Sequence, residues 1–507
     1  MIKKVSLRFG LSLLLITLQL LLLLSAGSSL LWLYPRLSQF GIVISWLVFM
    51  WLLRKDEAAD YKLTWVIMVM SFPVVGGVLY LTFNKSQYVR RKIAAHAKEH
   101  AIIAKLLDAD GVMDFPKFHS EGKRSLFRYV RQASAYHGYE HTTTQYYPWG
   151  QDMFADMLTA LQGAERFILL EYFIVKSSTM WDELVVILEQ KVAQGVEVRV
   201  IIDDFGSQKL FTNAYIAQLR AKGIQVLRFN PIIPILFVFM NTRDHRKIMV
   251  IDGDTAFVGG VNIADEYVNR TAPLGTWKDT GLKLQGQGVW SLTLMFIEMW
   301  DTFAGKVGRI DNHQDYAPLD VVAHPSDGLV LPYGDSPLDG ERLGENIYIE
   351  ILNQARQYVY IFTPYLIISE KLSHALQMAA ARGVDVRIVT PGIPDKKLVF
   401  RLTRSYYARL ITAGVRIYEY TPGFMHAKSF VCDDDTAVVG TINLDYRSLY
   451  LHFENAVLIH QASTVAAIKA DALATIAHSR QIPLAEVSKY KWIGLVDAVL
   501  HLFAPLM

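Results

Sequence analysis

Long apolar runs occupy the start of the chain, and shorter apolar segments alternate with polar ones in the rest. The three long runs are residues 11–33, 37–53 and 63–83. A membrane-spanning helix needs about 20 apolar residues, so the first and third runs are long enough and the second is short. Pro73 and the pair Gly76-Gly77 interrupt the third run, which favours a re-entrant or interfacial segment. We therefore predict a membrane anchor over residues 1–84 with two spans, and three full spans are the alternative.

Basic residues beside these runs predict their orientation. Three basic residues, Lys3, Lys4 and Arg8, precede the first run. Arg36 is the only basic residue between the first run and the second. Basic residues gather on the cytoplasmic side of spanning helices, so two spans leave both the N-terminus and everything after residue 84 in the cytoplasm. Residues 26–28 resemble a signal-peptide cleavage site, but the apolar stretch continues past them, which favours an uncleaved anchor. We expect a multi-pass protein of the cell membrane.

The chain beyond the anchor contains an internal repeat. An apolar strand, a helix and a second strand follow one another at 167–174, 184–193 and 195–204, and again at 359–365, 372–381 and 383–390. Strands that alternate with short amphipathic helices indicate a mostly parallel sheet. We predict an α/β fold of two pseudo-twofold halves at 150–320 and 321–460. Residues 85–149 would form a connector and 461–507 a C-terminal helical segment.

Composition narrows the class of protein. Apolar residues make up 52% of the chain and charged residues 20%, which excludes a disordered chain. The net charge of +3 does not suggest a nucleic-acid partner. Cys432 is the one cysteine, so the chain has no intramolecular disulfide, and its place in a predicted strand favours a buried apolar role.

Each half contains the same group of polar residues. The first copy has His245, Lys247, Asp252, Gly259-Gly260 and Asn262; the second has His426, Lys428, Asp433, Gly440-Thr441 and Asn443. Both read His-x-Lys-x4-Asp-x6-Gly-small-x-Asn. A histidine and a lysine two positions apart on a strand share one face. A pseudo-twofold axis would bring two histidines, two lysines and two asparagines to one site.

This group of residues suits reaction at a phosphodiester. One histidine can attack phosphorus and the other can protonate the leaving alkoxide. Lys247, Lys428, Asn262 and Asn443 can hold the phosphate oxygens, where charge develops in the transition state. The lysines supply the positive charge, and neither zinc-ligand spacing nor an acidic cluster is evident, so we expect no metal and no cofactor. Asp252 and Asp433 are counted with the catalytic motifs, although seven residues separate each from its histidine, which favours a structural role.

Two further features each allow two interpretations. Residues 231–240, Pro-Ile-Ile-Pro-Ile-Leu-Phe-Val-Phe-Met, are an insertion relative to the second copy, and form either a buried strand or a loop that dips into lipid. Residues 492–503 form an apolar helical stripe that either packs on the domain or lies on a membrane. Glu171 and Asp203-Asp204, at strand ends near the predicted site, are expected to cap helices or form structural ion pairs, with substrate binding as the alternative.

The duplicated motif resembles the HKD motif of the phospholipase D superfamily. Longer segments look like the bacterial cardiolipin synthases, namely 277–280, 391–396, 422–426, 440–448 and 453–454. Together with the apolar N-terminal runs, they extend the resemblance over nearly the whole chain. The first copy departs from the pattern at Gly260, where the second has Thr441 and a hydroxyl is common. The first half would then lack one hydroxyl donor.

The resemblance implies an enzyme that joins two phosphatidylglycerol molecules at a lipid bilayer, giving cardiolipin and glycerol. His245 would be the nucleophile and His426 the acid and base, with the reverse assignment still open. In this superfamily a carboxylate downstream of each motif orients the histidine, and Asp279 and Glu454 are the matching positions. The alternatives are a hydrolytic phospholipase D, a phosphatidylserine-forming transferase and a catalytically inactive lipid-binding scaffold. The sequence does not predict an oligomeric state.

Overall fold

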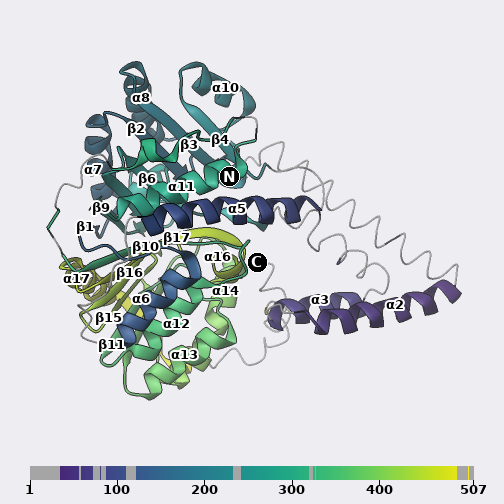
Figure 1. Cartoon of the computed structure of the whole chain (residues 1–507). Helices are drawn as coiled ribbons and strands as arrows, with labels where there is room; N and C mark the ends of the chain where they lie inside the picture. Colours follow the sequence, from purple (N-terminus) through teal and green to yellow (C-terminus); the bar gives the residue numbers. More distant parts are fainter. Residues whose placement is uncertain are drawn as a thin grey trace. The chain divides into compact units, whose positions relative to one another are not determined.

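The computed structural model describes residues 25, 35–55, 59–71, 80, 87–109, 121–231, 241–305, 307–318, 324–325, 327–487 and 501 (Figure 1). The chain divides into two units. One contains residues 1–94, 230–242 and 493–507, and the other contains residues 95–229 and 243–492. Several predicted segments lie outside the described residues, so their predicted roles stay predictions. They are most of the first apolar run, part of the third, residues 232–240 of the insertion and most of 492–503.

In the first unit, two apolar helices contact each other. They are α2 (Pro35–Leu53) and α3 (Ala59–Ser71). Val48, Leu52, Trp65, Val69 and Tyr80 form a small buried cluster. In the part of the chain that the structure describes, no helix has both the length and the apolar character needed to cross a membrane.

The first half of the second unit is a seven-stranded sheet in the order β1-β9-β7-β6-β2-β3-β4. Its strands are β1 (Thr142–Tyr147), β2 (Phe167–Tyr172), β3 (Glu197–Asp203), β4 (Gln225–Phe229), β6 (Lys247–Ile251), β7 (Thr255–Gly259) and β9 (Gly281–Gly286). Strands β2, β3 and β4 run parallel, and β6, β7, β9 and β1 continue the sheet antiparallel. The parallel part has the strand–helix–strand order expected from the sequence. The prediction of a mostly parallel sheet is wrong, because the strands that follow the βαβ units, β6, β7 and β9, fold back as hairpins and pair antiparallel.

The second half repeats this order as β10-β17-β16-β15-β11-β12-β13, with β18 added at the edge. Its strands are β10 (Leu329–Asp335), β11 (Tyr358–Phe362), β12 (Asp385–Pro391), β13 (Arg416–Tyr420), β15 (Ser429–Cys432), β16 (Thr436–Gly440), β17 (His452–His460) and β18 (Ser479–Gln481). The two α/β halves predicted from the repeat are therefore confirmed. Strand β1 belongs to the first sheet although it lies within the range expected for the connector, and β18 extends the second sheet beyond residue 460.

Helices cover both sheets (Figure 1). The first half has α7 (Gly150–Gln162), α8 (Thr179–Ala193), α9 (Asp204–Ser207), α10 (Asn213–Ala221), α11 (Val289–Phe303) and the 3-10 turns η2 (Asp265–Val268) and η3 (His313–Tyr316). The second has α12 (Leu343–Gln354), α13 (Glu370–Ala381), α14 (Lys397–Ser405), α15 (Tyr407–Thr412), α16 (Tyr446–Tyr450), α17 (Thr464–Ala477) and α18 (Leu484–Val487). Before them come α5 (Gln87–Ala109) and α6 (Glu121–Ser134).

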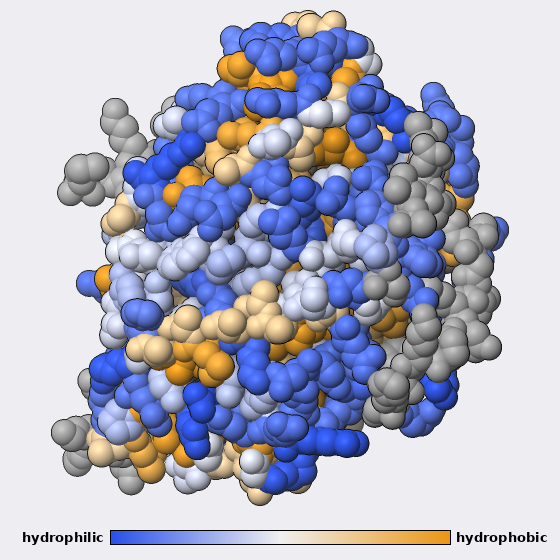
Figure 2. Space-filling view, turned by 90° about the vertical axis from the view of Figure 1, so that its left-hand side faces the viewer, coloured by the Kyte–Doolittle hydropathy of each residue, from blue (hydrophilic) through white to orange (hydrophobic). Residues whose placement is uncertain are grey.

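Helix α11 joins the cores of the two halves. Its residues 289–302 are all buried, and it contacts β2, β4 and β6 of the first sheet and β10 of the second. A helix that is apolar on every side is stable only when neighbours cover it all round. In contrast to the buried helix α11, the outer face that carries α7 and α17 is mainly polar, and its apolar residues lie in small separate patches (Figure 2).

Two short strand pairs cross between the halves. Strand β5 (Arg243–Asp244), from the first half, pairs in parallel with β17 of the second. Strand β8 (Thr276–Lys278), also from the first half, pairs in parallel with β14 (Gly423–Met425) of the second. Each crossing ends one residue before a motif histidine, so these pairs fix the two motifs against each other.

Candidate active site

The crossing strands hold both motif histidines by their backbone. The N–H of His245 donates to the carbonyl of Phe453 at 2.9 Å, and the N–H of His426 donates to the carbonyl of Lys278 at 2.8 Å. In both cases the acceptor is the residue directly before a candidate carboxylate, Glu454 or Asp279. The strand register therefore places each histidine beside a carboxylate of the opposite half.

The side chains form two crossed pairs. His245 Nδ1 lies 2.9 Å from both carboxylate oxygens of Glu454, and His426 Nδ1 lies 2.6 Å from Asp279 Oδ2. Both carboxylates are fully buried. Each histidine thus contacts the carboxylate that follows the other motif. Linear spacing cannot reveal this exchange because it arises from the pairing of strands far apart in the chain.

The motif lysines lie on the same strands as the histidines, as the two-residue spacing predicts. Lys247 Nζ donates to the carbonyl of His245 at 2.5 Å. Lys428 Nζ donates to the carbonyl of His426 and lies 2.9 Å from its Nδ1. Both lysines are about 99% buried. An ammonium has three donors, so each lysine keeps hydrogen-bonding capacity for a phosphate oxygen.

Burial and mutual repulsion set the charge of these groups. Burial lowers the pKa of His245 well below its usual range, and Lys247, His452, Lys428 and His426 lower it further. Burial and then Lys428 lower the pKa of His426 to about 4, although Asp279 opposes them. Burial raises the pKa of Glu454, against the opposing charge of Lys247. Because groups of both halves affect His245, the two motifs face one shared site.

The lysines predict an alkaline loss of activity. Burial lowers the pKa of Lys247 to about 7 and that of Lys428 to about 8. Each lysine must be charged to bind a phosphate, and each loses its proton as the pH rises. Since kcat/KM reports the free enzyme, we expect it to fall above pH 7 and more steeply above pH 8. The measurement is a pH profile at constant ionic strength, with return to neutral pH as the control. A flat kcat/KM from neutral pH to about 9 would contradict the expectation.

The two motif asparagines differ in their contacts. Asn262 accepts a hydrogen bond from the N–H of Ile174 at 3.0 Å and donates to the Tyr267 hydroxyl at 2.9 Å. Asn443 is buried, and its Oδ1 has no hydrogen-bond partner. Asn262 therefore has one amide hydrogen left for a ligand. The side chain of Asn443 hydrogen-bonds Asp445, which acts to lower the pKa of that carboxyl.

The motif aspartates lie away from the histidines. Asp252 and Asp433 follow the far ends of β6 and β15, each with a positive φ. Asp252 accepts hydrogen bonds from the N–H groups of 165–167, and Asp433 from those of 356–358, at 2.7–3.0 Å. These contacts tie the turn after each motif strand to the start of the central strand. They favour the structural role over the catalytic one, because neither carboxylate joins the histidine cluster.

Gly260 and Thr441 mark a built-in asymmetry of the site. The Thr441 hydroxyl donates to Glu454 and so fixes the carboxylate beside His245. At the equivalent position a Cβ on Gly260 would lie 2.0 Å from Asp279 Oδ1. The first half lacks a hydroxyl there because Asp279 itself occupies that space.

Gly260→Ala should therefore displace the carboxylate that holds His426. A misplacement of about 1 Å can cost about 100-fold in rate, so we expect kcat to fall by about that factor. The measurement is kcat of the folded variant. Gly163→Ala is the matched control, because its Cβ would meet only Ala160 O at 3.4 Å, an ordinary contact. A Gly260→Ala enzyme with unchanged kcat would show that Asp279 can move without consequence.

Sequence reasoning missed one histidine and a set of aromatic neighbours. His452 lies on β17 two residues before Glu454, with its ring centroid 5.5 Å from that of His245. Phe173 contacts both rings. The ring of His426 instead contacts Tyr267, Trp277 and Phe424. The alternation of strand β17, which puts residues 452 and 454 on one face, was the available signal for His452.

The expected structural roles of the strand-end carboxylates and Cys432 agree with their contacts. Asp203 caps α9 and accepts the N–H of Asp244 at 3.1 Å, which braces the strand before His245. Glu171 is fully buried 3.9 Å from Arg246. Cys432 is buried in β15, and burial raises its thiol pKa.

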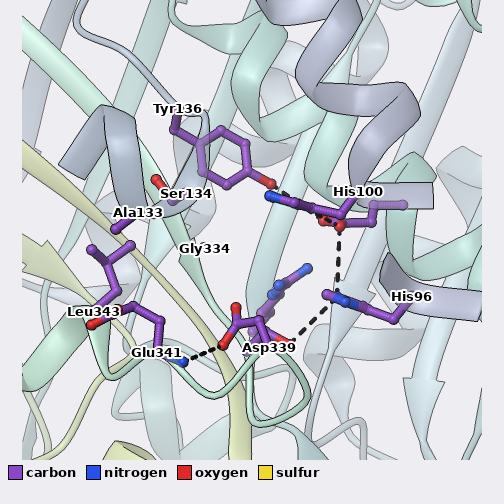
Figure 3. Close-up of a pocket in the computed structure, with 12 residues that line it drawn as sticks. His96, His100, Ala133, Ser134, Tyr136, Gly334, Asp339, Glu341 and Leu343 are labelled. Atoms are coloured by element: carbon purple, nitrogen blue, oxygen red, sulfur yellow. Dashed lines mark hydrogen bonds and ion pairs between the residues drawn. The ribbon is translucent and has the colours of Figure 1, made fainter. Parts of the chain in front are cut away.

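A small pocket is lined by residues of α5, α6 and β10 (Figure 3). His96 and His100 of α5 lie at its edge, and His100 Nδ1 is 2.9 Å from Glu298 Oε1. Burial acts to raise the pKa of Glu298, but the hydrogen bond from His100 and the nearby positive charges outweigh it and lower that pKa. Arg246 also lines the pocket and donates to the carbonyl of Glu454 at 3.2 Å. This arginine ties the wall of the pocket to the strand that carries Glu454.

Comparisons with known proteins agree with this architecture. A family model for the phospholipase D-like domain of cardiolipin synthases matches residues 157–274 and 348–474. The chain is 34% identical to cardiolipin synthase 2 of Bacillus anthracis, covering 88% of this chain and 86% of that one. It is 33% identical to a cardiolipin synthase of Geobacillus kaustophilus, covering 88% of each. A solved phosphatidylserine synthase of Haemophilus influenzae covers 76% of this chain and 100% of its own, at 15% identity and a TM-score of 0.60, and this likeness shows the fold.

Proposed function

Because the chain belongs to the cardiolipin synthase family of phospholipase D-like phosphatidyltransferases, we propose that it converts two phosphatidylglycerol molecules into cardiolipin and glycerol through a phosphohistidine. The observation that carries the mechanism is the crossed pairing of two buried histidines with two buried carboxylates, flanked by two lysines. Such an arrangement supplies a nucleophile, an acid and charge for the phosphate in one site.

In the first step, His245 Nε2 attacks phosphorus and the bond to the glycerol oxygen breaks. His426 gives its Nε2 proton to that oxygen, and free glycerol leaves. Glu454 stabilises the imidazolium character that develops on His245, as the carboxylate of a catalytic triad does. Lys247 and Lys428 hold the equatorial oxygens, and Asn262 and Asn443 add neutral donors.

In the second step, the terminal hydroxyl of another phosphatidylglycerol attacks the phosphohistidine. His426, now neutral, takes the hydroxyl proton, and the bond from His245 to phosphorus breaks to release cardiolipin. The electrostatics support this division of roles. Burial lowers the pKa of both rings, but Asp279 partly offsets this at His426, so His426 is the ring that takes up a proton more readily.

We also propose that residues 1–84 anchor the enzyme in the cell membrane with two spans and leave the catalytic unit in the cytoplasm. The apolar runs and the basic residues beside them support this. Near the site, Ile393 and Leu398 are 41% and 61% exposed, next to the exposed Lys396 and Lys397. Exposed apolar and basic side chains gathered around the start of α14 suit contact with an anionic lipid surface. Lys396 also lowers the pKa of His452, which indicates that the start of α14 lies near the catalytic groups.

Purified full-length protein with phosphatidylglycerol as the sole lipid, without added metal, tests the activity. We expect cardiolipin and glycerol in equal amounts. Phosphatidic acid as the sole product would indicate a hydrolase and contradict the synthase assignment. A parallel reaction of phosphatidylglycerol with added serine tests for phosphatidylserine, which would indicate the other transferase. No lipid product, from protein that retains its fold, would favour a scaffold.

A further inference from the structure

Beyond the proposed reaction, we infer that His245, His452 and Glu454 form a site for Zn²⁺ that switches the enzyme off. Among the residues that the structure describes, these three make a buried group in which one ligand atom from each lies within 4.8 Å of the others. Two imidazoles and a carboxylate are a ligand set that zinc takes readily, with a water completing the tetrahedron.

The unpartnered ring of His452 is the observation that points to a ligand. His452 is 92% buried, yet neither of its ring nitrogens has a hydrogen-bond partner. A buried polar group without a partner costs about 1–3 kcal/mol, so an uncompensated imidazole here needs an explanation. The proposed transfer reaction assigns it no role, and the pseudo-equivalent His426 has aromatic neighbours in place of a second imidazole.

The distances allow zinc to bind with small movements. His245 Nδ1 lies 2.9 Å from Glu454, and His452 Nδ1 lies 3.6 Å from Glu454 Oε1. Zinc–ligand bonds of about 2.0–2.2 Å in a tetrahedron separate the ligand atoms by about 3.3–3.5 Å.

Zinc in this position would stop the reaction through the tautomer of His245. In the active form the proton of neutral His245 is on Nδ1, facing Glu454, and the Nε2 lone pair is free to attack phosphorus. Zinc needs the Nδ1 lone pair, so the same proton must lie on Nε2. His245 then loses both the lone pair that attacks phosphorus and the carboxylate contact that orients its ring. The number of protons on the ring stays the same.

The test measures zinc binding by calorimetry on the purified full-length protein in detergent, without lipid substrate. We expect a site whose affinity falls about tenfold or more in His452→Asn and in His452→Gln. His426→Asn is the matched control: it alters the other histidine and should keep the wild-type affinity. Far-UV circular dichroism of each variant checks the fold.

A second readout is the activity with zinc divided by the activity without zinc. A chelator should restore the lost activity. The concentration of zinc that halves this ratio should rise about tenfold or more in the His452 variants. Zinc binding that is unchanged in both His452 variants, or equally weakened in His426→Asn, would overturn the inference. Because binding is measured without turnover, this result is independent of whether the proposed synthase reaction holds.

Discussion

His245→Ala and His426→Ala should each lose cardiolipin synthesis by a factor of about 10⁴ or more. Residues that act as one catalytic unit are strongly non-additive, and removing either one costs about as much as removing both. The expectation follows from one shared site, in which groups of both halves set the pKa of His245. His374→Ala is the control, because His374 is exposed on α13, and it should retain wild-type turnover.

Labelled phosphatidylglycerol distinguishes the roles of the two histidines. If His245 is the nucleophile, His426→Ala protein should still acquire label slowly, and peptide mapping should place the label on His245. His245→Ala protein should acquire none. Label on His426 in the His245→Ala variant would reverse the assignment, and full turnover by either variant would contradict a two-histidine mechanism.

The second large effect concerns the crossed carboxylates. Glu454→Gln and Asp279→Asn should each lower kcat by about 10²–10⁴-fold, because an amide no longer holds the required tautomer or stabilises the imidazolium. Both substitutions keep the shape of the side chain, so the loss reflects charge. Asp433→Asn, whose carboxylate binds backbone N–H groups at 2.7–3.0 Å away from the histidines, should affect thermal stability more than kcat.

Double-mutant cycles can detect which carboxylate belongs to which histidine. The coupling between His245→Ala and Glu454→Gln, measured in thermal unfolding, should be about 1.5–3 kcal/mol, as for a hydrogen bond to a charged group. The coupling between His245→Ala and Asp279→Asn should be much smaller, since no direct hydrogen bond joins that pair. A large His245–Asp279 coupling, with none to Glu454, would refute the crossed arrangement.

The repeat made the two halves predictable, because apolar strands and amphipathic helices leave periodic patterns in the sequence. It also predicted that His245, Lys247, His426 and Lys428 gather, since the pseudo-twofold relation applies to all of them. The sequence could not predict that Glu454 pairs with His245 and Asp279 with His426. This arrangement depends on the two-residue pairing of β5 with β17, and neither strand length nor composition of Arg243-Asp244 signals such a strand.

Gly260 and His452 show a different limit. From the sequence, Gly260 reads as the loss of a hydroxyl donor, whereas in the structure the space for a side chain is filled by Asp279. His452 belongs to a strand whose nine residues are all buried, so burial does not separate a packing residue from a functional one, and only the face shared with Glu454 distinguishes His452. In both cases the missing information is a contact between segments that are distant in the chain.

The crossed pairs also determine when the enzyme can first exist during its synthesis. The two histidine–carboxylate pairs join residues 209 and 147 positions apart. Contacts of such long range form late, because closing long loops costs entropy before the contact repays it. A ribosome that has released only the first half has made His245, Lys247 and Asp279, but their partners are still untranslated. The nascent chain therefore stays inactive until β17 has emerged and paired with β5, because only then does His245 gain its carboxylate.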